Sequence, residues 1–570
     1  PFWPDPEIHS IFGDTPTPER IRKLGGVAPY LSPAFERLQA SHIKNYLSHV
    51  NPYTGKTYAE ETVFAGWELT NENKFIPCMF SAQCIKELPP ALLDQLKHLW
   101  SKWQDDQGEG ANKSETLPPF EDGWNKSNLP RHEQYRKFVV SRFVATSKRL
   151  EHVARSQAPS GQGIAVQPIA FNTHDQNLLS AHVADSAGDF VAIGAYQTPL
   201  TRDSSAQYFP WDPFLKRGPI LHNFNYGAVE GKPLLVYETS FFSPYAYRSE
   251  WAFVMLGLAA SQDWDAVYLY AYGQPNIIYR GDGGNQGYGQ SPLPIPISMD
   301  SRSGRNYTFG FHHGGDEILV AAWMLGGWGF VGGGLLPSMK TVKYRFGAGN
   351  LYGLPPGYCS SASGCAQGSK PVIHEMNNAS LQAKLRISFD ENLTHGKTCN
   401  PCEFSNPSAQ IQVTDSIVWD TKNSRAIFDS PRFKAVGGQL EGKVSFKGGI
   451  NVTFNRPVFG SFGLYAADGR ALEESLDIRV VAAGSSQNTD FRFSPAKINF
   501  DLPYGAIAGV LNPGRAPVQI TRPDLNTVLP GKKGKLSRYN FALEKYAHSE
   551  FDGQLAISST ELFFFGRIER

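Results

Sequence analysis

Residues 67–73 read Trp67-Glu68-Leu69-Thr70-Asn71-Glu72-Asn73 and follow the apolar run Val63, Phe64 and Ala65. An apolar run that closes with a group of polar residues is typical of a buried strand and the loop at its exit. Because side chains alternate along a strand, Glu68, Thr70 and Glu72 would share one side. A carboxylate at the carboxyl end of a buried parallel strand is where a barrel enzyme places its chemistry.

A second apolar run, far downstream, also ends in one glutamate. Residues 232–239 read Lys232-Pro233-Leu234-Leu235-Val236-Tyr237-Glu238-Thr239. Two glutamates, each closing its own strand, are the groups that hydrolysis of a glycosidic bond requires. We therefore interpret Glu72 and Glu238 as a candidate catalytic pair. The alternative for Glu72 is an ordinary carboxylate in a surface loop.

These motifs resemble those of a known family. Trp-Glu-Leu-x-Asn-Glu is similar to the strand-4 motif of clan A glycoside hydrolases, especially family 5 and its mannanase-like and cellulase-like members. The segment Asn51-Pro52-Tyr53-Thr54-Gly55 looks like one that precedes strand 4 in a cellulase-like branch, and Val236-Tyr237-Glu238-Thr239 looks like the strand-7 motif. The resemblance covers roughly residues 30 to 275.

The resemblance implies roles for single residues. Glu72 would be the acid/base of a retaining mechanism, Glu238 the nucleophile, and Asn71 a donor to the 2-hydroxyl of the sugar. Tyr196, at the end of the preceding strand, would donate to Glu238; the alternative for it is a core aromatic. Many relatives carry His two residues before this Tyr, where this chain has Gly194, so one polar wall of the family's cleft is missing here.

Other candidate substrate-binding residues lie near the ends of later strands. Trp264, Tyr270 and Tyr272 surround the last strand, where relatives carry an aromatic floor for the bound sugar, and each of them also fits a core position. His174 lies in a loop from which it can reach the cleft, although an ordinary loop histidine fits as well. Glu68 is interpreted as a buried structural carboxylate paired with Arg or Lys.

Strand-like runs that alternate with helical ones predict an α/β fold with parallel strands. The predicted strands span 63–72, 163–171, 189–196, 234–238 and 266–272, and the predicted helices span 90–103, 131–157 and about 247–262. In the family's order these strands are numbers 4 to 8 of a (β/α)8 TIM barrel, which needs roughly 250 residues. Because about 60 residues precede the first of them, we expect strands 1 to 3 to come from polypeptide outside this numbering, either an N-terminal segment or an associated chain.

The pattern of apolar and polar residues changes after residue 340. Short alternating strands separated by turn residues predict one or two β-sandwich modules over 341–570, after a barrel domain over 1–340. The uncharged run 318–337 contains six glycines, and we interpret it as a buried helix followed by a glycine-rich loop instead of a membrane span.

Composition bounds the classes of partner. The chain has 570 residues with 54 basic and 53 acidic side chains, a net charge of +1, so no basic excess indicates nucleic acid. Aromatic residues make up 13%, which suits either sugar stacking or a large core. We expect a carbohydrate substrate, no cofactor and no metal; His312 and His313 beside Asp316 are interpreted as a loop.

Cysteines and sequons favour a secreted protein. The six cysteines form near pairs, which predicts local disulfides Cys78–Cys84, Cys359–Cys365 and Cys399–Cys402 in an oxidising compartment, with zinc as the alternative for the last pair. Sequons for N-glycosylation, which also arise by chance in a chain of this length, lie at Asn112, Asn125, Asn306, Asn378, Asn392 and Asn451.

Overall fold

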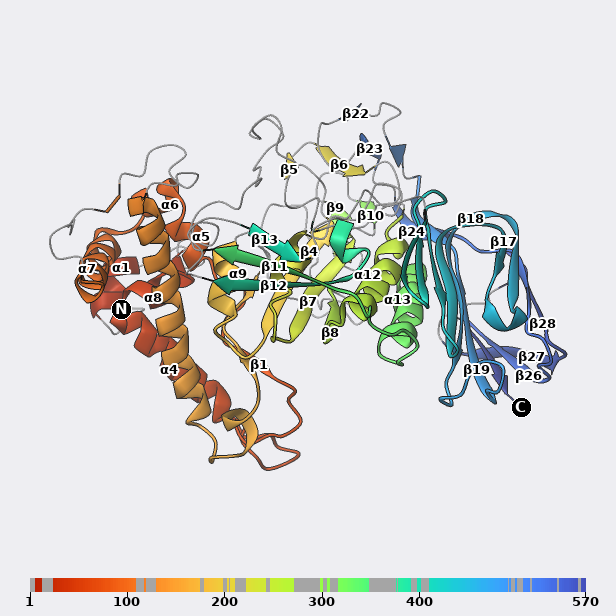
Figure 1. The fold of residues 1–570 in the computed structure, drawn as a ribbon, viewed down its shortest axis with the longest axis horizontal. Coiled ribbons are helices and arrows are strands. Elements are labelled where there is room, and N and C mark those ends of the chain that lie inside the picture. Colours follow the sequence, from red (N-terminus) through yellow and green to blue (C-terminus); the bar gives the residue numbers. More distant parts are fainter. Residues whose placement is uncertain are drawn as a thin grey trace.

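The computed structural model places helices at one end of the molecule, parallel strands in the middle and a large antiparallel sheet at the other end (Figure 1). It describes residues 6–12, 24–108, 117–118, 130–174, 179–197, 202–203, 206–210, 222–241, 247–270, 298–300, 305–307, 316–347, 376, 378–390, 397–400, 410–490, 492–493, 498–499, 506–512, 515–540, 543–561 and 565–569.

The helical end is built from the first 155 residues. Its helices are α1 (Pro6–Phe12), α3 (Ala28–Leu31), α4 (Pro33–Leu47), α5 (Phe75–Met79), α6 (Ala82–Lys86), α7 (Pro90–Asp106) and α8 (Pro130–Arg155). Helix α4 begins where Ser32 Oγ accepts a hydrogen bond from the backbone N–H of Phe35 at 3.4 Å. The Tyr30 ring stacks on Phe75 and Phe143 with centroid distances of 4.7 and 5.1 Å. The helices predicted over 90–103 and 131–157 are confirmed by α7 and α8.

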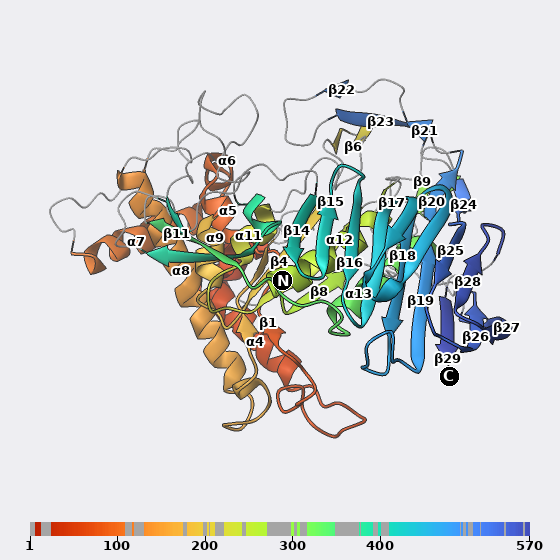
Figure 2. The same cartoon turned by 45° about the vertical axis from the view of Figure 1, so that its right-hand side comes forward.

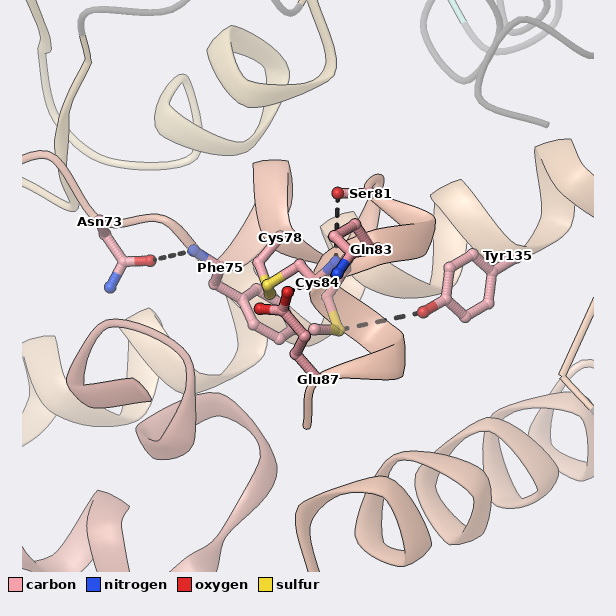
Figure 3. The surroundings of a disulfide bond; sticks show 9 residues. Asn73, Phe75, Cys78, Ser81, Gln83, Cys84, Glu87 and Tyr135 are labelled. Carbon is pink, nitrogen blue, oxygen red and sulfur yellow. Dashed lines mark hydrogen bonds between the residues drawn. A yellow bond between two sulfur atoms is a disulfide. The ribbon is translucent and has the colours of Figure 1, made fainter. Parts of the chain in front are cut away.

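A disulfide closes the turn between α5 and α6. Cys78 and Cys84 are bonded, and Ser81 Oγ between them accepts a hydrogen bond from the backbone N–H of Cys84 at 3.2 Å (Figure 3). This pair confirms the first predicted disulfide. Cys359, Cys365 and Cys402, together with the side chain of Cys399, lie outside the described residues.

The predicted parallel strands lie side by side in sequence order. β1 (Trp67–Glu68) pairs with β2 (Ile169–Ala170), and the same chain segment continues into β3 (Thr173–His174). β3 pairs with β4 (Val191–Gln197), β4 with β7 (Leu234–Phe241), and β7 with β8 (Ala266–Leu269), all of them parallel. Short helices α9 (Leu179–Asp185) and α11 (His222–Gly227) and the 3-10 turn η2 (Gly163–Ala165) lie between these strands in the chain.

Three of the five strands are shorter than predicted, and the last of them, predicted over 266–272, ends at Leu269 with Tyr270 in a turn. The expected strand over 63–72 is regular only at β1, and the one over 163–171 starts as η2 and becomes a strand at Ile169. Across the residues that the structure describes, the parallel strands form an open arrangement, and no closed barrel is present. The α/β class is therefore confirmed, whereas barrel closure is not part of the described structure.

Two apolar helices connect the parallel strands to the large sheet. In α12 (Ser249–Gln262) every side chain is buried, and α13 (Glu317–Phe330) packs along it. A Cβ atom at Gly326 would lie 2.6 Å from Leu256, so glycine is what allows this close approach. Helix α13 confirms the buried helix predicted within 318–337. No helix in the described ranges has both the length and the apolar character needed to cross a bilayer.

The large antiparallel sheet begins later in the chain than residue 340. β11 (Thr341–Gly347) pairs in parallel with β12 (Lys384–Asp390) and antiparallel with β13 (Lys397–Asn400). β12 in turn attaches to the α/β part, because the N–H of Glu230 donates to the carbonyl of Ile387 at 2.7 Å. Gln262 at the end of α12 also bonds the carbonyls of Ser380 and Ala383, both at 2.6 Å. The predicted boundary at 340/341 stays a prediction; the large antiparallel sheet begins at Gln410.

The large sheet is antiparallel throughout and holds a core of its own. Its strands are β14 (Gln410–Thr414), β15 (Ile417–Asp420), β16 (Arg425–Asp429), β17 (Phe433–Ser445), β18 (Asn451–Ala466), β19 (Asp477–Ala483), β25 (Leu525–Val528), β26 (Gly534–Tyr539), β27 (Lys545–Phe551), β28 (Gln554–Ile557) and β29 (Phe565–Glu569), with the 3-10 turn η4 (Lys447–Gly449) between β17 and β18. Figure 2 shows β14 to β19 in succession across it. Buried side chains from β17–β19 and β25–β29 form a second apolar core, separate from that of the α/β part.

Smaller sheets join distant parts of the sequence. They contain β5 (Arg202–Asp203), β6 (Ala206–Pro210), β9 (Ser298–Asp300), β10 (Arg305–Tyr307), β20 (Ser485–Thr489), β21 (Arg492–Phe493), β22 (Ile498–Asn499), β23 (Ala506–Asn512) and β24 (Arg515–Thr521). β23 pairs with β6 about 300 residues earlier in the chain, as the register Ile507↔Pro210 shows. The C-terminal region is therefore hydrogen-bonded to the first half of the chain through β23 and β6.

Candidate active site

The loop that carries Glu72 is held against the end of β2. The buried side chain of Asn172 accepts hydrogen bonds through Oδ1 from the hydroxyl of Thr70 at 3.0 Å and from the backbone N–H of Asn73 at 2.9 Å. Between these two contacts the chain turns sharply, and Glu72 has a φ of 47°. A left-handed backbone is costly for a residue other than glycine and persists where surrounding contacts enforce it. The half-buried Glu72 is thus presented by a fixed loop and not by a regular strand.

Strand β7 contains a bulge at Tyr237 and Glu238. Along β4 the partners step from Ile193↔Val236 to Gly194↔Glu238, and along β8 they step from Val236↔Val267 to Thr239↔Leu269. Both neighbours therefore advance one residue less than β7 does. A bulge of this kind re-aims side chains and is common beside active sites.

The bulge places two consecutive side chains on the same face. Tyr237 packs with Leu235 beside the small buried cluster Ala170, Phe190 and Ala192, which defines that face. Glu238 pairs with Gly194, which lies two residues from Ala192 and so shares its side of β4. Thr239 already faces the other way, because its Oγ1 accepts a hydrogen bond from the indole of Trp251 in α12 at 2.6 Å. In a regular strand, Tyr237 and Glu238 would point to opposite faces.

A hydrogen bond joins the two predicted catalytic segments. The hydroxyl of Tyr237 donates to Oε1 of Glu72 at 3.1 Å, across 165 residues of sequence. Since Tyr237 precedes Glu238 and both share one face, this contact brings the loop after β1 to the face on which Glu238 lies. Glu72 therefore lies on the face of β7 that carries Glu238, beyond the carboxyl end of β1.

Glu68 is a third carboxylate on this face. It pairs with Ala170, whose side chain belongs to the same small cluster, and it has no Lys or Arg within ion-pair distance among the described residues. Its side chain is exposed and not buried as predicted, yet partial desolvation by the neighbouring protein raises the pKa of its carboxyl to about 7, and the negative charge of Glu238 adds to that rise. The predicted pairing of Glu68 with a cation is thus replaced by proximity to a like charge.

Other predicted site residues take various positions. Asn71 is exposed in the loop beside Glu72, and Tyr270 follows β8, where its N–H donates to the carbonyl of Thr239 at 3.2 Å. Tyr196 lies in β4 opposite Ser240, so its backbone is at the same end of the strands as Glu238. His174 ends β3; the side chains of Tyr196 and His174, and all of Tyr272, lie outside the described residues.

Trp264 takes the core position that the sequence left as its alternative. It precedes β8 and is 5% exposed, with its ring 5.5 Å from that of Phe224. The amino end of a parallel strand is the end remote from Glu238. The structure therefore removes Trp264 from the candidate sugar platform and leaves Tyr270 at the correct end.

Two residues of the site were missed by sequence reasoning. Tyr237 was taken as part of an apolar run, and Asn172 was not considered. The combination of Gly194 with a Tyr immediately before Glu238 was visible in the sequence, but its meaning depends on the strand register. The motif Asn51–Gly55 forms a turn before β1 in the chain, in which Asn51 Nδ2 donates to Oε1 of the buried Glu61 at 2.9 Å.

Neither metal ligation nor relatives add a further constraint. Within the described ranges, no cluster of three or more His, Cys, Asp or Glu side chains is placed to hold a metal ion. Asp316, predicted in a loop with two histidines, instead caps α13, since its Oδ1 accepts from the N–H of Leu319 at 3.2 Å. The chain matches no protein-family model and no curated protein. The resemblance to clan A glycoside hydrolases thus rests on the quoted motifs.

Proposed function

We propose that this chain is a secreted, retaining β-glycoside hydrolase that acts on a β-linked poly- or oligosaccharide. The observation that carries the proposal is the hydrogen bond from Tyr237 to Glu72, which joins the glutamate loop after β1 to the strand that presents Glu238. The order of the parallel strands supports a clan A type of (β/α)8 barrel as the underlying fold. The Cys78–Cys84 bond supports an oxidising compartment.

The proposed reaction is a double displacement. Glu72, in its protonated form, gives its proton to the glycosidic oxygen while the carboxylate of Glu238 attacks the anomeric carbon and the bond to the leaving sugar breaks. Glu72 then removes a proton from water, which attacks the anomeric carbon and releases Glu238. For this retaining outcome the two carboxyl groups should lie about 5 to 5.5 Å apart, whereas inversion requires about 6.5 to 9.5 Å.

The competing proposal is a catalytically inactive relative that binds glycans. The open arrangement of the described parallel strands, and Gly194 where relatives carry a histidine, favour it. In a structural protein, neither glutamate would need its present surroundings. The two proposals differ in one measurable property, which is turnover.

The test is hydrolysis of a panel of β-linked glucans, mannans and their oligosaccharides, measured as the release of reducing ends. We expect turnover by the wild type and a loss of about 10³-fold or more in Glu238→Gln, because removal of a nucleophile disables the whole catalytic unit. Glu550→Gln, at an exposed position in β27, is the matched control and should retain full activity. Proton NMR of the first product anomer should show retention. Absence of turnover on every glycan would favour the binding protein.

A further inference from the structure

We propose that Tyr237 is a positioning residue for Glu72, and that the lack of a side chain at Gly194 is the structural condition for it. The inference rests on the proposed glycosidase function and assigns a task to a residue outside the catalytic pair. It also gives a reason for the glycine at the position where relatives carry a histidine.

The first step concerns space. A Cβ atom built on Gly194 would lie 2.9 Å from two carbons of the Tyr237 ring and 3.0 Å from its hydroxyl oxygen. Such separations lie well inside van der Waals contact of about 3.5 to 4.0 Å. The ring therefore lies directly over the backbone of β4, in the volume that any other residue at position 194 would fill.

The second step concerns direction. The bulge turns Tyr237 and Glu238 to the same face, and the floor beneath the ring is the buried cluster Ala170, Phe190 and Ala192. Packed on this floor and over Gly194, the ring has little freedom. Its hydroxyl reaches Glu72 Oε1 at 3.1 Å from a site fixed by two central strands.

The third step concerns the glutamate. Glu72 lies on a loop, with a left-handed backbone, and Asn172 secures the residues on both sides of it. These contacts fix the backbone but not the orientation of the carboxyl group. A donor from the adjacent neighbour of Glu238 fixes that orientation relative to the nucleophile, which is the relation that a retaining enzyme must hold.

The hydrogen bond also distinguishes the two oxygens of Glu72. Because Oε1 accepts from Tyr237, the proton that Glu72 delivers is carried on Oε2. In the second half of the reaction the same Oε2 accepts the proton from water. Tyr237 itself exchanges no proton with the substrate; it selects which oxygen of Glu72 does so.

The experiment uses substrates that differ in their need for an acid. Phenyl β-cellobioside and phenyl β-mannobioside require protonation of the leaving oxygen, whereas their 2,4-dinitrophenyl counterparts leave without it. In Tyr237→Phe we expect kcat/KM to fall about 10- to 100-fold for the phenyl substrates, the size of a lost hydrogen bond to a carboxyl group that becomes charged as it gives up its proton in the transition state. For the dinitrophenyl substrates we expect a change below about 3-fold, since lost packing alone would affect both.

Two controls separate positioning from general damage. Tyr465→Phe removes a hydroxyl in β18 that accepts from Arg432 and donates to the carbonyl of Gly332 after α13, and it should leave the rates on both kinds of substrate unchanged. Gly194→Ala should reproduce the selectivity of Tyr237→Phe by displacing the ring. A Cβ atom at Gly227 would lie 3.0 Å from Leu234 on the other face of the same strands. Gly227→Ala therefore introduces a comparable close contact there, and it should not reproduce the selectivity. If Gly194→Ala fails to fold, Tyr237→Phe decides alone.

The outcomes are distinct. An equal loss on both leaving groups, or no loss on either, overturns the positioning role while the glycosidase proposal stands through Glu238→Gln. A wild type that hydrolyses none of the four substrates and no glycan of the panel overturns both. A selective loss in Tyr237→Phe and Gly194→Ala, non-additive in the double variant, supports the inference.

Discussion

Arg248 and Asp316 lie wholly buried where the helices meet the large sheet, whereas Glu68 and Glu238 lie at the open carboxyl end of the parallel strands. In the first cluster, Arg248 Nε contacts Asp316 Oδ2 at 2.5 Å, and the hydroxyl of Ser486 in β20 donates to Asp316 Oδ1 at 2.6 Å. In the second, one carboxylate raises the pKa of the other. Opposite charges are joined at the junction, and like charges are brought together at the candidate site.

The difference shows that the charges at the junction stabilise the folded state, whereas those at the candidate site destabilise it. Burial works against the charged form of Asp316, but Arg248 and Ser486 outweigh that cost and lower the pKa of its carboxyl. At Glu68, burial and the neighbouring charge act in the same direction and raise the pKa. Unfavourable arrangements of charge cluster at functional sites, so the comparison itself supports the site at β1 and β7.

The largest expected effect is at the junction. Asp316→Ala removes the carboxylate that neutralises the buried Arg248 and removes the cap of α13, and we expect a loss of about 3 to 5 kcal/mol in the free energy of unfolding. Urea denaturation of the full chain measures it. Asp94→Ala, which breaks the exposed pair with Lys97, is the control and should cost less than about 0.5 kcal/mol. Equal effects for the two variants would remove the contrast between the clusters.

A smaller effect of opposite sign is expected at Glu68. Its folded pKa of about 7 exceeds the ordinary value of 4.5, so the folded state binds more protons between these pH values and stability falls as pH rises through that window. Glu68→Gln should therefore raise the free energy of unfolding by about 1 kcal/mol at pH 8, after allowance for solvent screening of an exposed group, and leave it unchanged near pH 4. Denaturation at both pH values measures this, and a variant less stable than wild type at pH 8 would contradict it.

The smallest expected effect tests the coupling between the two carboxylates. In a Glu238→Gln background the charge that raises the pKa of Glu68 is absent, so the pH window of the Glu68→Gln effect should move to lower pH. We expect a shift below about one pH unit, because burial is the larger cause of the raised pKa. The measurement is the pH dependence of stability for the four members of the double-variant cycle. An unchanged window would mean that Glu238 does not act on Glu68.

Sequence reasoning succeeded for elements stabilised by local features. The helices α7 and α8 follow their apolar periodicity, and α13 follows from an uncharged run preceded by the capping residue Asp316. The strand over 63–72 was predicted too long, because the loop after Glu68 is held by Asn172, about 100 residues away. The boundary at residue 340 stays a prediction, and β12 beyond it bonds to the α/β part through Ile387.

The sequence by itself determined that Glu72 and Glu238 each follow a short apolar run, because apolar patterning is a local property of the chain. Only the tertiary structure decided how these groups meet. The bulge at Tyr237, the open volume over Gly194 and the proximity of Glu68 to Glu238 depend on the register between strands far apart in the chain. A shift of one residue in a strand turns every side chain to the other face, so no local pattern fixes that register.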